Sequence, residues 1–296
     1  MAKYITPAVT PFLENGKIDE AACAALYEHL ITGGVDGILV LGSIGEFFAL
    51  SLEDKKRLIS LAVTCAKGRI PIIAGTADMD FSNVLELSRY ALAEGADSVI
   101  VVSPYYFPLT PEQIFTYYDT LAKEIPGRIY LYNFPDRTGY TIPADIVLRL
   151  AQAHSNIVGI KDTISGLDHT RELIKAVKPV RPDFEIYSGF DDNFAHNVLC
   201  GGDGCIAGLS NVAPEVCHSW ATAVNSGDWA ESARLQQVIN RLMDIYTVGA
   251  PFIPFIKAAA ALRGVPVRNI PSFPFTAASD SQIEALRGIL SREDLL

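Results

Sequence analysis

The segment 156–162, with the sequence NIVGIKD, is a short apolar run that carries a lysine, Lys161, near its end. Such a run is typical of a buried β-strand. An ammonium group is costly to bury unless it is paired, and burial lowers the pKa of a lysine so that the neutral amine is favoured. An enclosed neutral amine attacks carbonyl groups, and the protonated imine that results is an electron sink for making or breaking a C–C bond. We therefore expect Schiff-base chemistry on a keto substrate at Lys161.

Two other interpretations of the lysines stay open. Lys161 could lie at the exit of its strand, with its head group in solvent or paired with Asp162. Lys257, in the sequence PFIPFIKAAAAL, is the other lysine with apolar neighbours. Because Lys257 falls in an expected helix beyond the last strand, we interpret it as a side chain that extends along the helix to solvent.

Polar residues also follow other apolar runs. In GSIGEF, Gly42 and Gly45 flank Ser43. A turn of this kind can expose backbone N–H groups that bind a carboxylate, with the hydroxyl as a further donor. The alternative is a turn in which the glycines only satisfy a positive φ angle.

Tyrosines and acids follow three later runs. SPYYFP and YNFPDRTG place Tyr106 and Tyr132 at expected strand ends. Tyr132 is a candidate proton shuttle, because a phenol beside an iminium can donate and accept, although tyrosines also fill such positions by packing. In YSGFDDNF, Asp191 and Asp192 either cap the next helix or accept hydrogen bonds from substrate hydroxyl groups.

Short apolar runs and longer segments of helical periodicity alternate along the chain, as in repeated βα units around a parallel sheet. The eight expected strands lie at 4–10, 36–42, 70–76, 98–104, 128–134, 156–162, 184–190 and 204–210. The helices expected between them lie at 19–32, 52–67, 82–94, 111–124, 143–153, 167–178 and 191–200. Cap-capable residues open several of these helices: Asp19, Ser51, Ser82 and Thr110, the last followed by Pro111. Eight such units in about 250 residues predict a closed (β/α)8 TIM barrel.

The runner-up fold is an open doubly wound sheet, but no GxGxxG follows the first strand and no Walker motif is present. We expect the barrel core over residues 1–212. Residues 213–296 then supply the final barrel helix and a C-terminal helical extension of the same domain, with helices at 213–226, 228–247, 252–263 and 280–292.

Composition excludes several classes of partner. The 296 residues are 49% hydrophobic and carry a net charge of -10, which repels nucleic acid and anionic lipid. We find no leader and no apolar stretch of about 18 residues, so we expect a cytoplasmic protein without a membrane anchor. Five cysteines form an odd set without a CxxC pair, which favours reduced thiols: Cys23, Cys65, Cys200, Cys205 and Cys217. The five histidines show no HxH or HExxH spacing, and we expect neither a metal nor an organic cofactor.

GSIGEF, SPYY, YNFPDRTG, GIKDT and GFDD occur in that order at the expected strand ends. Together these motifs resemble the pyruvate-dependent class I aldolase family of dihydrodipicolinate synthase and N-acetylneuraminate lyase. The resemblance runs from about residue 4 to the C-terminal helices, and its style is most similar to the bacterial 2-keto-3-deoxygluconate aldolases. It implies a TIM-barrel lyase that acts through a lysine Schiff base without a cofactor.

The resemblance also implies roles for individual residues. Lys161 would form the Schiff base, Tyr132 would be the acid/base phenol, and Ser43 would bind a carboxylate and relay protons. Tyr106 would reach into a neighbouring subunit's site, which implies a homotetramer built as a dimer of dimers. The remaining residues of the implied substrate site are Ile44, Arg137, Thr163, Gly189, Asp191, Asp192 and Ile206.

Departures from the family pattern bear on the substrate. The synthases carry two consecutive threonines where this chain has Ser43 and Ile44, so a backbone amide must replace one hydroxyl. They also have GxKE at the sixth strand, where this chain has GIKDT. Arg137, however, matches the arginine with which the synthases bind the carboxylate of the second substrate.

Three functions follow for comparison. The first is an aldolase of carbohydrate metabolism that cleaves a 2-keto-3-deoxy sugar acid, such as 2-keto-3-deoxygluconate, to pyruvate and an aldehyde. The alternative is a 4-hydroxy-tetrahydrodipicolinate synthase, which condenses pyruvate with aspartate semialdehyde. The third is a barrel that senses a keto acid without turnover, and the set of Lys161, Tyr132 and Ser43 argues against it.

Overall fold

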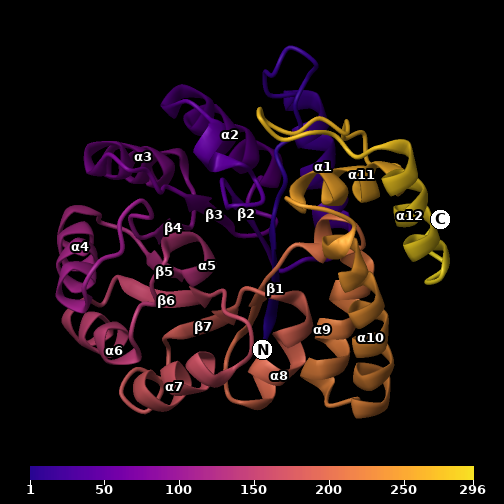
Figure 1. The fold of residues 1–296 in the computed structure, drawn as a ribbon. Helices are drawn as coiled ribbons and strands as arrows, with labels where there is room; N and C mark the ends of the chain where they lie inside the picture. The colour runs from indigo at the N-terminus through magenta and orange to yellow at the C-terminus, as the bar shows by residue number, and fades with distance from the viewer. The chain divides into compact units, whose positions relative to one another are not determined.

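The computed structural model describes residues 1–296, and its eight strands follow one another in sequence order around a closed barrel (Figure 1). The strands are β1 (Lys3–Pro7), β2 (Gly37–Val40), β3 (Ile72–Gly75), β4 (Ser98–Val102), β5 (Ile129–Asn133), β6 (Ile157–Asp162), β7 (Glu185–Ser188) and β8 (Gly204–Ile206). The strand pairs from β3 to β8, and β1 with β2, are parallel. The (β/α)8 barrel predicted from the sequence is confirmed.

The chain forms two compact units, which we describe separately. The first contains Met1–Ala2 and Ile73–Ile206, with helices α3 (Phe81–Glu94), α4 (Pro111–Glu124), α5 (Pro135–Thr138), α6 (Ala144–Ala153), α7 (Asp168–Val177) and α8 (Phe194–Leu199). Figure 1 shows α3, α4, α6 and α7 on the outer side of strands β4 to β7. The second contains Lys3–Ile72 and Ala207–Leu296, with α1 (Glu20–Thr32), α2 (Leu52–Ala66), α9 (Pro214–Ser226), α10 (Trp229–Leu242), α11 (Ile253–Leu262) and α12 (Asp280–Ser291). The division at residue 212 stays a prediction.

Most of the expected helix caps are confirmed. The side chains of Asp19, Ser51 and Thr110 accept backbone N–H groups at the starts of α1, α2 and α4, and Thr110 forms a full capping box. The prediction for Ser82 is wrong, because Asp80 caps α3 and accepts the Ser82 N–H at 2.9 Å. The aspartate two residues earlier accepts the free N–H group at the start of the helix.

A register shift in β6 is the irregularity with the largest consequence for chemistry. Ile129 of β5 lies opposite Ile157, but Tyr130 lies opposite Gly159, so Val158 is an extra residue without a partner. From there on Tyr132 lies opposite Lys161. Without the extra residue Tyr132 would lie opposite Ile160, so this bulge brings the lysine beside the tyrosine.

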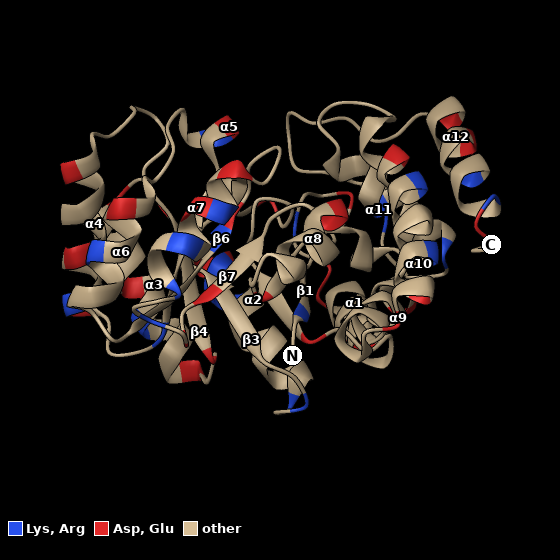
Figure 2. Cartoon of the chain, turned by 90° about the horizontal axis from the view of Figure 1, so that it is seen from below, with Lys and Arg blue, Asp and Glu red and all other residues tan.

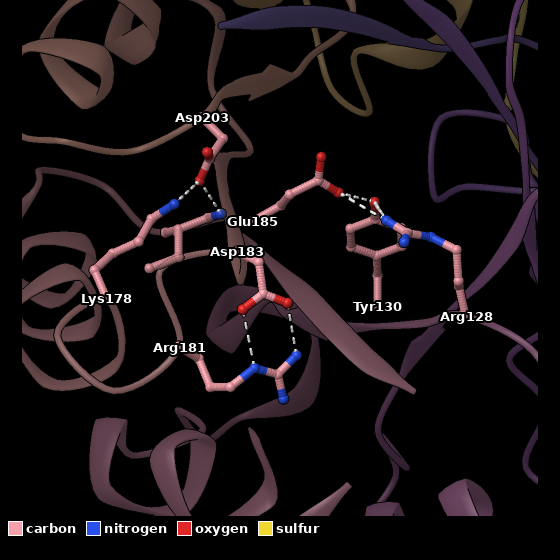
Figure 3. Close-up of polar contacts among 8 residues, drawn as sticks. Arg128, Tyr130, Lys178, Arg181, Asp183, Glu185 and Asp203 are labelled. Carbon is pink, nitrogen blue, oxygen red and sulfur yellow. Dashed lines mark hydrogen bonds and ion pairs between the residues drawn. The ribbon is translucent and has the colours of Figure 1, made fainter. Parts of the chain in front are cut away.

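Charged and phenolic side chains gather at the N-terminal ends of β5 and β7 (Figure 3). The Tyr130 hydroxyl donates to the Glu185 carboxylate, and the Arg128 guanidinium approaches the same carboxylate at 3.4 Å. Burial, followed by the negative charge of Glu185, raises the pKa of Tyr130. Nearby, Asp203 accepts the Ile186 N–H at 2.7 Å and pairs with Lys178 at 2.7 Å. The Asp203 carboxylate therefore holds the turn that precedes β8.

Gly159 packs against this cluster, and we expect Gly159→Ala to destabilise the protein strongly. An added Cβ would lie 2.4 Å from the Glu185 carbonyl oxygen and 2.7 Å from the Tyr130 ring, and the backbone atom cannot move aside. Overpacking of this kind costs about 1–3 kcal/mol of unfolding free energy, and more where a backbone atom is in the way. Urea unfolding measures it, with Gly288→Ala in α12 as the control, because nothing lies within 4 Å of that Cβ. A Gly159→Ala protein as stable as the control would contradict the packing described here.

Surface charges of both signs lie on α4, α6 and α12, as Figure 2 shows. The exposed ion pairs include Lys123–Asp119 in α4 and Arg149–Glu112 between α6 and α4. Pairs of this kind contribute little to stability. None of the helices combines the length and the apolar character needed to cross a lipid bilayer.

Candidate active site

Lys161 is the penultimate residue of β6 in the first unit, and 4% of its surface is exposed. Its Nζ lies 4.5 Å from the centre of the Tyr132 ring, which is equally buried on β5. The structure gives Lys161 no ion-pair partner, and the interpretation of a head group in solvent is wrong. A buried amine without an ion-pair partner is a suitable nucleophile for imine chemistry.

The alternative pairing of Lys161 with Asp162 is also wrong. Adjacent residues of a strand point to opposite faces, so Asp162 faces the helices while Lys161 faces Tyr132. The Asp162 carboxylate accepts the Asn133 amide at 2.7 Å, the Thr170 hydroxyl at 2.7 Å and a ring nitrogen of His169 at 3.0 Å. The Asp162 carboxylate is therefore bound by residues on the outer side of the strand, and not by Lys161.

Tyr187 of β7 lies opposite Lys161 on the other flank. Its side chain is fully buried, and burial together with Glu185 raises the pKa of its phenol. The Tyr187 hydroxyl forms no hydrogen bond with acceptable geometry. Lys161 thus lies between tyrosines on both neighbouring strands, and the sequence analysis identified only Tyr132.

Thr163 and Gly189 are brought into direct contact. A Cβ on Gly189 would lie 1.9 Å from the Thr163 hydroxyl oxygen, so no other residue fits there. That hydroxyl is buried and has no hydrogen-bond partner. Ile206, the last residue of β8, is fully buried.

Asp191 and Asp192 begin a 3-10 turn directly after β7. Neither residue is the N-cap of α8, because α8 begins at Phe194 and its N-cap residue is Asn193, which makes no side-chain cap bond. Both acids lie in the first turn of the 3-10 helix that precedes α8. Asp191 is 2% exposed. Burial raises the pKa of the Asp192 carboxyl, only partly offset by the backbone N–H groups of Asp192 and Asn193.

Two predicted site residues lie on the surface of the first unit. Arg137 in α5 is exposed, with its guanidinium 5.2 Å from the centre of the Phe134 ring, and that ring is stacked on Tyr132 at 5.9 Å. Tyr106 is 77% exposed and contacts Phe107, itself 73% exposed. Neither Tyr106 nor Phe107 has a partner for most of its apolar surface within this chain.

Ser43 and Ile44 belong to the second unit, in the turn that follows β2. The expectation that the glycines release their N–H groups is wrong for Gly45, which donates to the Gly42 carbonyl at 3.0 Å. The Ile44 N–H has no hydrogen-bond partner. A backbone amide is therefore present where the family pattern has a threonine hydroxyl.

The glycines of this turn do not have positive φ angles, so that alternative is also wrong. The positive φ angles fall on the flanking Leu41 and Glu46, at 60° and 57°. Gly45 is needed for close approach, because a Cβ there would lie 3.0 Å from the Ala8 carbonyl oxygen. Residues other than glycine are rare in the left-handed region, so the surroundings must hold this turn in place.

Glu46 is held by Lys257, and both side chains are completely buried. The Lys257 ammonium donates to Glu46 and to the Ile270 carbonyl at 3.0 Å, and lies 4.4 Å from the centre of the Phe12 ring. The other Glu46 oxygen accepts the Ser272 N–H at 2.7 Å. Burial lowers the pKa of Lys257, and Glu46 opposes that shift. The interpretation of Lys257 as a side chain that extends to solvent is wrong.

No cluster of three or more histidine, cysteine, aspartate or glutamate side chains has a geometry that could hold a metal ion. The sequence analysis missed His169, Glu46 and Tyr187. His169 lies in the first turn of α7, the helix that follows β6. This position could have suggested it, because the first turn of such a helix lies near the end of the preceding strand. Nothing in the local sequence pairs Glu46 with Lys257, 211 residues away.

The comparisons with known proteins agree with this arrangement. The dihydrodipicolinate synthetase family matches residues 1–293. The probable 2-dehydro-3-deoxy-D-pentonate aldolase YjhH of Escherichia coli K12 is 35% identical over 292 residues, covering 99% of this chain and 97% of the relative. The 4-hydroxy-tetrahydrodipicolinate synthase of Kosmotoga olearia is 37% identical over 279 residues, covering 94% of both. The crystal structure of E. coli YagE in complex with pyruvate has a TM-score of 0.97 at 34% identity, covering 100% of this chain and 99% of that one.

The closed barrel and these relatives define the class of the protein, which is a pyruvate-dependent class I lyase. The chain belongs to the dihydrodipicolinate synthetase family.

Proposed function

We propose that this enzyme cleaves a 2-keto-3-deoxy sugar acid, such as 2-keto-3-deoxygluconate, to pyruvate and an aldehyde through an imine on Lys161. The observation that carries the proposal is the buried Lys161 amine, unpaired and 4.5 Å from the Tyr132 ring. The names of two relatives support the substrate class, the pentonate aldolase YjhH and the putative 2-dehydro-3-deoxy-D-gluconate aldolase YagE. YagE binds pyruvate in its crystal structure.

In this mechanism the Lys161 amine adds to the C2 ketone, water leaves and a protonated imine forms. Tyr132 accepts the proton of the C4 hydroxyl. The C3–C4 bond then breaks, its electron pair enters the imine as an enamine, and C4 departs as the aldehyde. The enamine takes a proton at C3, and water hydrolyses the imine to release pyruvate and the free amine. No metal or organic cofactor enters, because the imine is the electron sink.

We assign the remaining roles to the other predicted residues. Ser43 and the Ile44 N–H bind the C1 carboxylate, and Ile206 packs at the pyruvate end. The turn from Gly189 to Asp192 binds the hydroxyl groups of the sugar acid together with Thr163. Asp192 suits that role, because it is exposed in this turn and a carboxylate accepts hydrogen bonds from hydroxyl groups.

We also propose a cytoplasmic homotetramer, built as a dimer of dimers, that works in carbohydrate metabolism. The exposed Tyr106 and Phe107 support assembly, because a pair of aromatic rings with this much exposed surface is typical of an interface. Tyr106 would then complete the site of a neighbouring copy.

A second candidate function is 4-hydroxy-tetrahydrodipicolinate synthase. The exposed Arg137 favours it, because its guanidinium has no carboxylate partner in the chain and lies over the Phe134 ring beside Tyr132. The guanidinium geometry suits a substrate carboxylate.

Two variants and two substrates separate these functions. Asp192→Asn should lower kcat/KM for cleavage of 2-keto-3-deoxygluconate by about tenfold, the effect of weakening one or two hydrogen bonds to a charged group. Arg137→Ala should change that reaction less than threefold. If the enzyme is a synthase, Arg137→Ala instead abolishes condensation of pyruvate with aspartate semialdehyde, and wild-type cleavage of sugar acids is negligible. Borohydride reduction with pyruvate, followed by mass spectrometry, must place the adduct on Lys161 in either case.

A further inference from the structure

Four residues behind Lys161 and Tyr132 form a closed ring of hydrogen bonds in the first unit. The Asn133 amide donates to Asp162 at 2.7 Å, and the Asn133 oxygen accepts the Ile142 N–H at 2.9 Å. The Ile142 carbonyl faces His169 Nε2 at 3.0 Å, and His169 Nδ1 faces the Asp162 oxygens at 3.0 and 3.1 Å. The side chains of Asp162 and His169 are 0% and 10% exposed. The four residues therefore hold one another without help from solvent.

The ring fixes the protonation state of His169. A carbonyl oxygen only accepts, so Nε2 must donate to Ile142. The Asp162 carboxylate accepts hydrogen bonds from Asn133 and from the Thr170 hydroxyl, each at 2.7 Å. An ionised carboxylate only accepts, so it has no proton to offer Nδ1. Nδ1 must donate as well. A histidine that donates from both nitrogens is an imidazolium ion.

The ring is attached directly to the two residues of the chemistry. Asn133 follows Tyr132 on β5, and Asp162 follows Lys161 on β6. Ile142 ends the segment that carries Arg137 and α5. Loss of either His169 bond would remove one of the contacts that hold the two strand ends from their outer side, and a displacement of about 1 Å between reacting groups can reduce a rate a hundredfold.

We propose that protonated His169 is a positioning residue of this enzyme, which closes the ring of Asp162, Asn133 and Ile142 and so holds Lys161 and Tyr132 in register for imine formation. The proposal rests on the proposed function of Lys161. It makes turnover depend on a proton that takes no part in the chemistry.

The pH dependence has a definite sign. Burial alone lowers the pKa of His169, but the hydrogen bond and charge of Asp162, the Ile142 carbonyl and the charge of Glu172 outweigh it and raise the pKa. Asp162 and Glu172 are the charged groups that act on His169. A raised pKa means that the proton stabilises the fold fully below the unfolded value of about 6.5, and that this contribution is lost as pH rises through the folded value. Closure of the ring, and with it the imine rate, should fall over the same interval.

Two variants each remove one bond. In His169→Asn the amide can replace Nδ1 but not Nε2, and in His169→Gln it can replace Nε2 but not Nδ1. Both should slow borohydride-trapped pyruvate imine formation by about tenfold or more at pH 7, with a smaller change in KM, and should lose the decline at high pH that the wild type shows. His154→Asn is the matched control, because it removes another histidine–aspartate pair, with Asp119 at 2.8 Å, without touching the ring.

Nitrogen-15 NMR of histidine-labelled wild-type enzyme should show both His169 ring nitrogens protonated at pH 7, with the signals assigned by their absence in His169→Asn. A neutral ring at pH 7, or His169 variants whose imine rates and pH profiles match those of His154→Asn, would overturn the inference. An absence of wild-type imine on Lys161 would instead overturn the proposed function, while the NMR result would still report on the ring.

Discussion

Lys161→Met is expected to abolish catalysis and leave the fold intact. The substitution keeps an unbranched side chain of similar length but removes the amine that forms the imine, so turnover should fall by about a thousandfold or more. Because Lys161 has no ion-pair partner and is 4% exposed, its replacement by an apolar side chain leaves no charge unpaired. Steady-state rates and borohydride trapping measure the loss, and thermal unfolding should show a midpoint equal to or above that of the wild type. Residual activity within tenfold of the wild type would exclude Lys161 as the Schiff-base lysine.

Lys257→Met is expected to have the opposite effect. The same substitution at the second buried lysine leaves the Glu46 carboxylate completely buried, with the Ser272 N–H as its remaining partner. Breaking one side of a buried ion pair costs about 3–5 kcal/mol of unfolding free energy. Urea unfolding at pH 7 measures this cost, and little soluble protein at 37 °C would be in line with it.

The double variant Lys257→Met, Glu46→Gln controls for the lost charge pair. An amide at position 46 can still accept the Ser272 N–H, and no buried charge remains, so the double variant should recover much of the stability lost by the single one. If the single and double variants unfold at the same urea concentration, the lysine stabilises the protein by packing against Phe12 and not by neutralising Glu46.

The sequence predicts the helices and strands of this protein better than the contacts between residues that lie far apart in the chain. The eight strands were found because parallel strands buried on both faces appear as continuous apolar runs. Lys161 was identified because it interrupts such a run. The interpretation of Lys257 was wrong because we assumed that a lysine in a helix can reach solvent. The segment IPFIKAAAAL is apolar on every side of the helix, and a helix of that kind is itself buried.

The ring around His169 could not be predicted for a different reason. Its members lie on β5, β6, α7 and the segment before α6, and their spacing in the chain is that of no known motif. Only the folded backbone brings the Ile142 carbonyl and the Asp162 carboxylate to the two nitrogens of one imidazole. The protonation state then follows from which partners can accept.

The unpaired Val158 determines which residue of β6 lies opposite Tyr132. Counting along β6 from its first paired residue, the amine faces Tyr132 only because one residue upstream is skipped. The insertion or deletion of a single residue three positions before the lysine could therefore create or abolish such a site. An alignment of family members on their lysine alone would miss a gap three residues earlier. A chain with such a gap would keep the lysine, but its side chain would point to the opposite face of the barrel sheet.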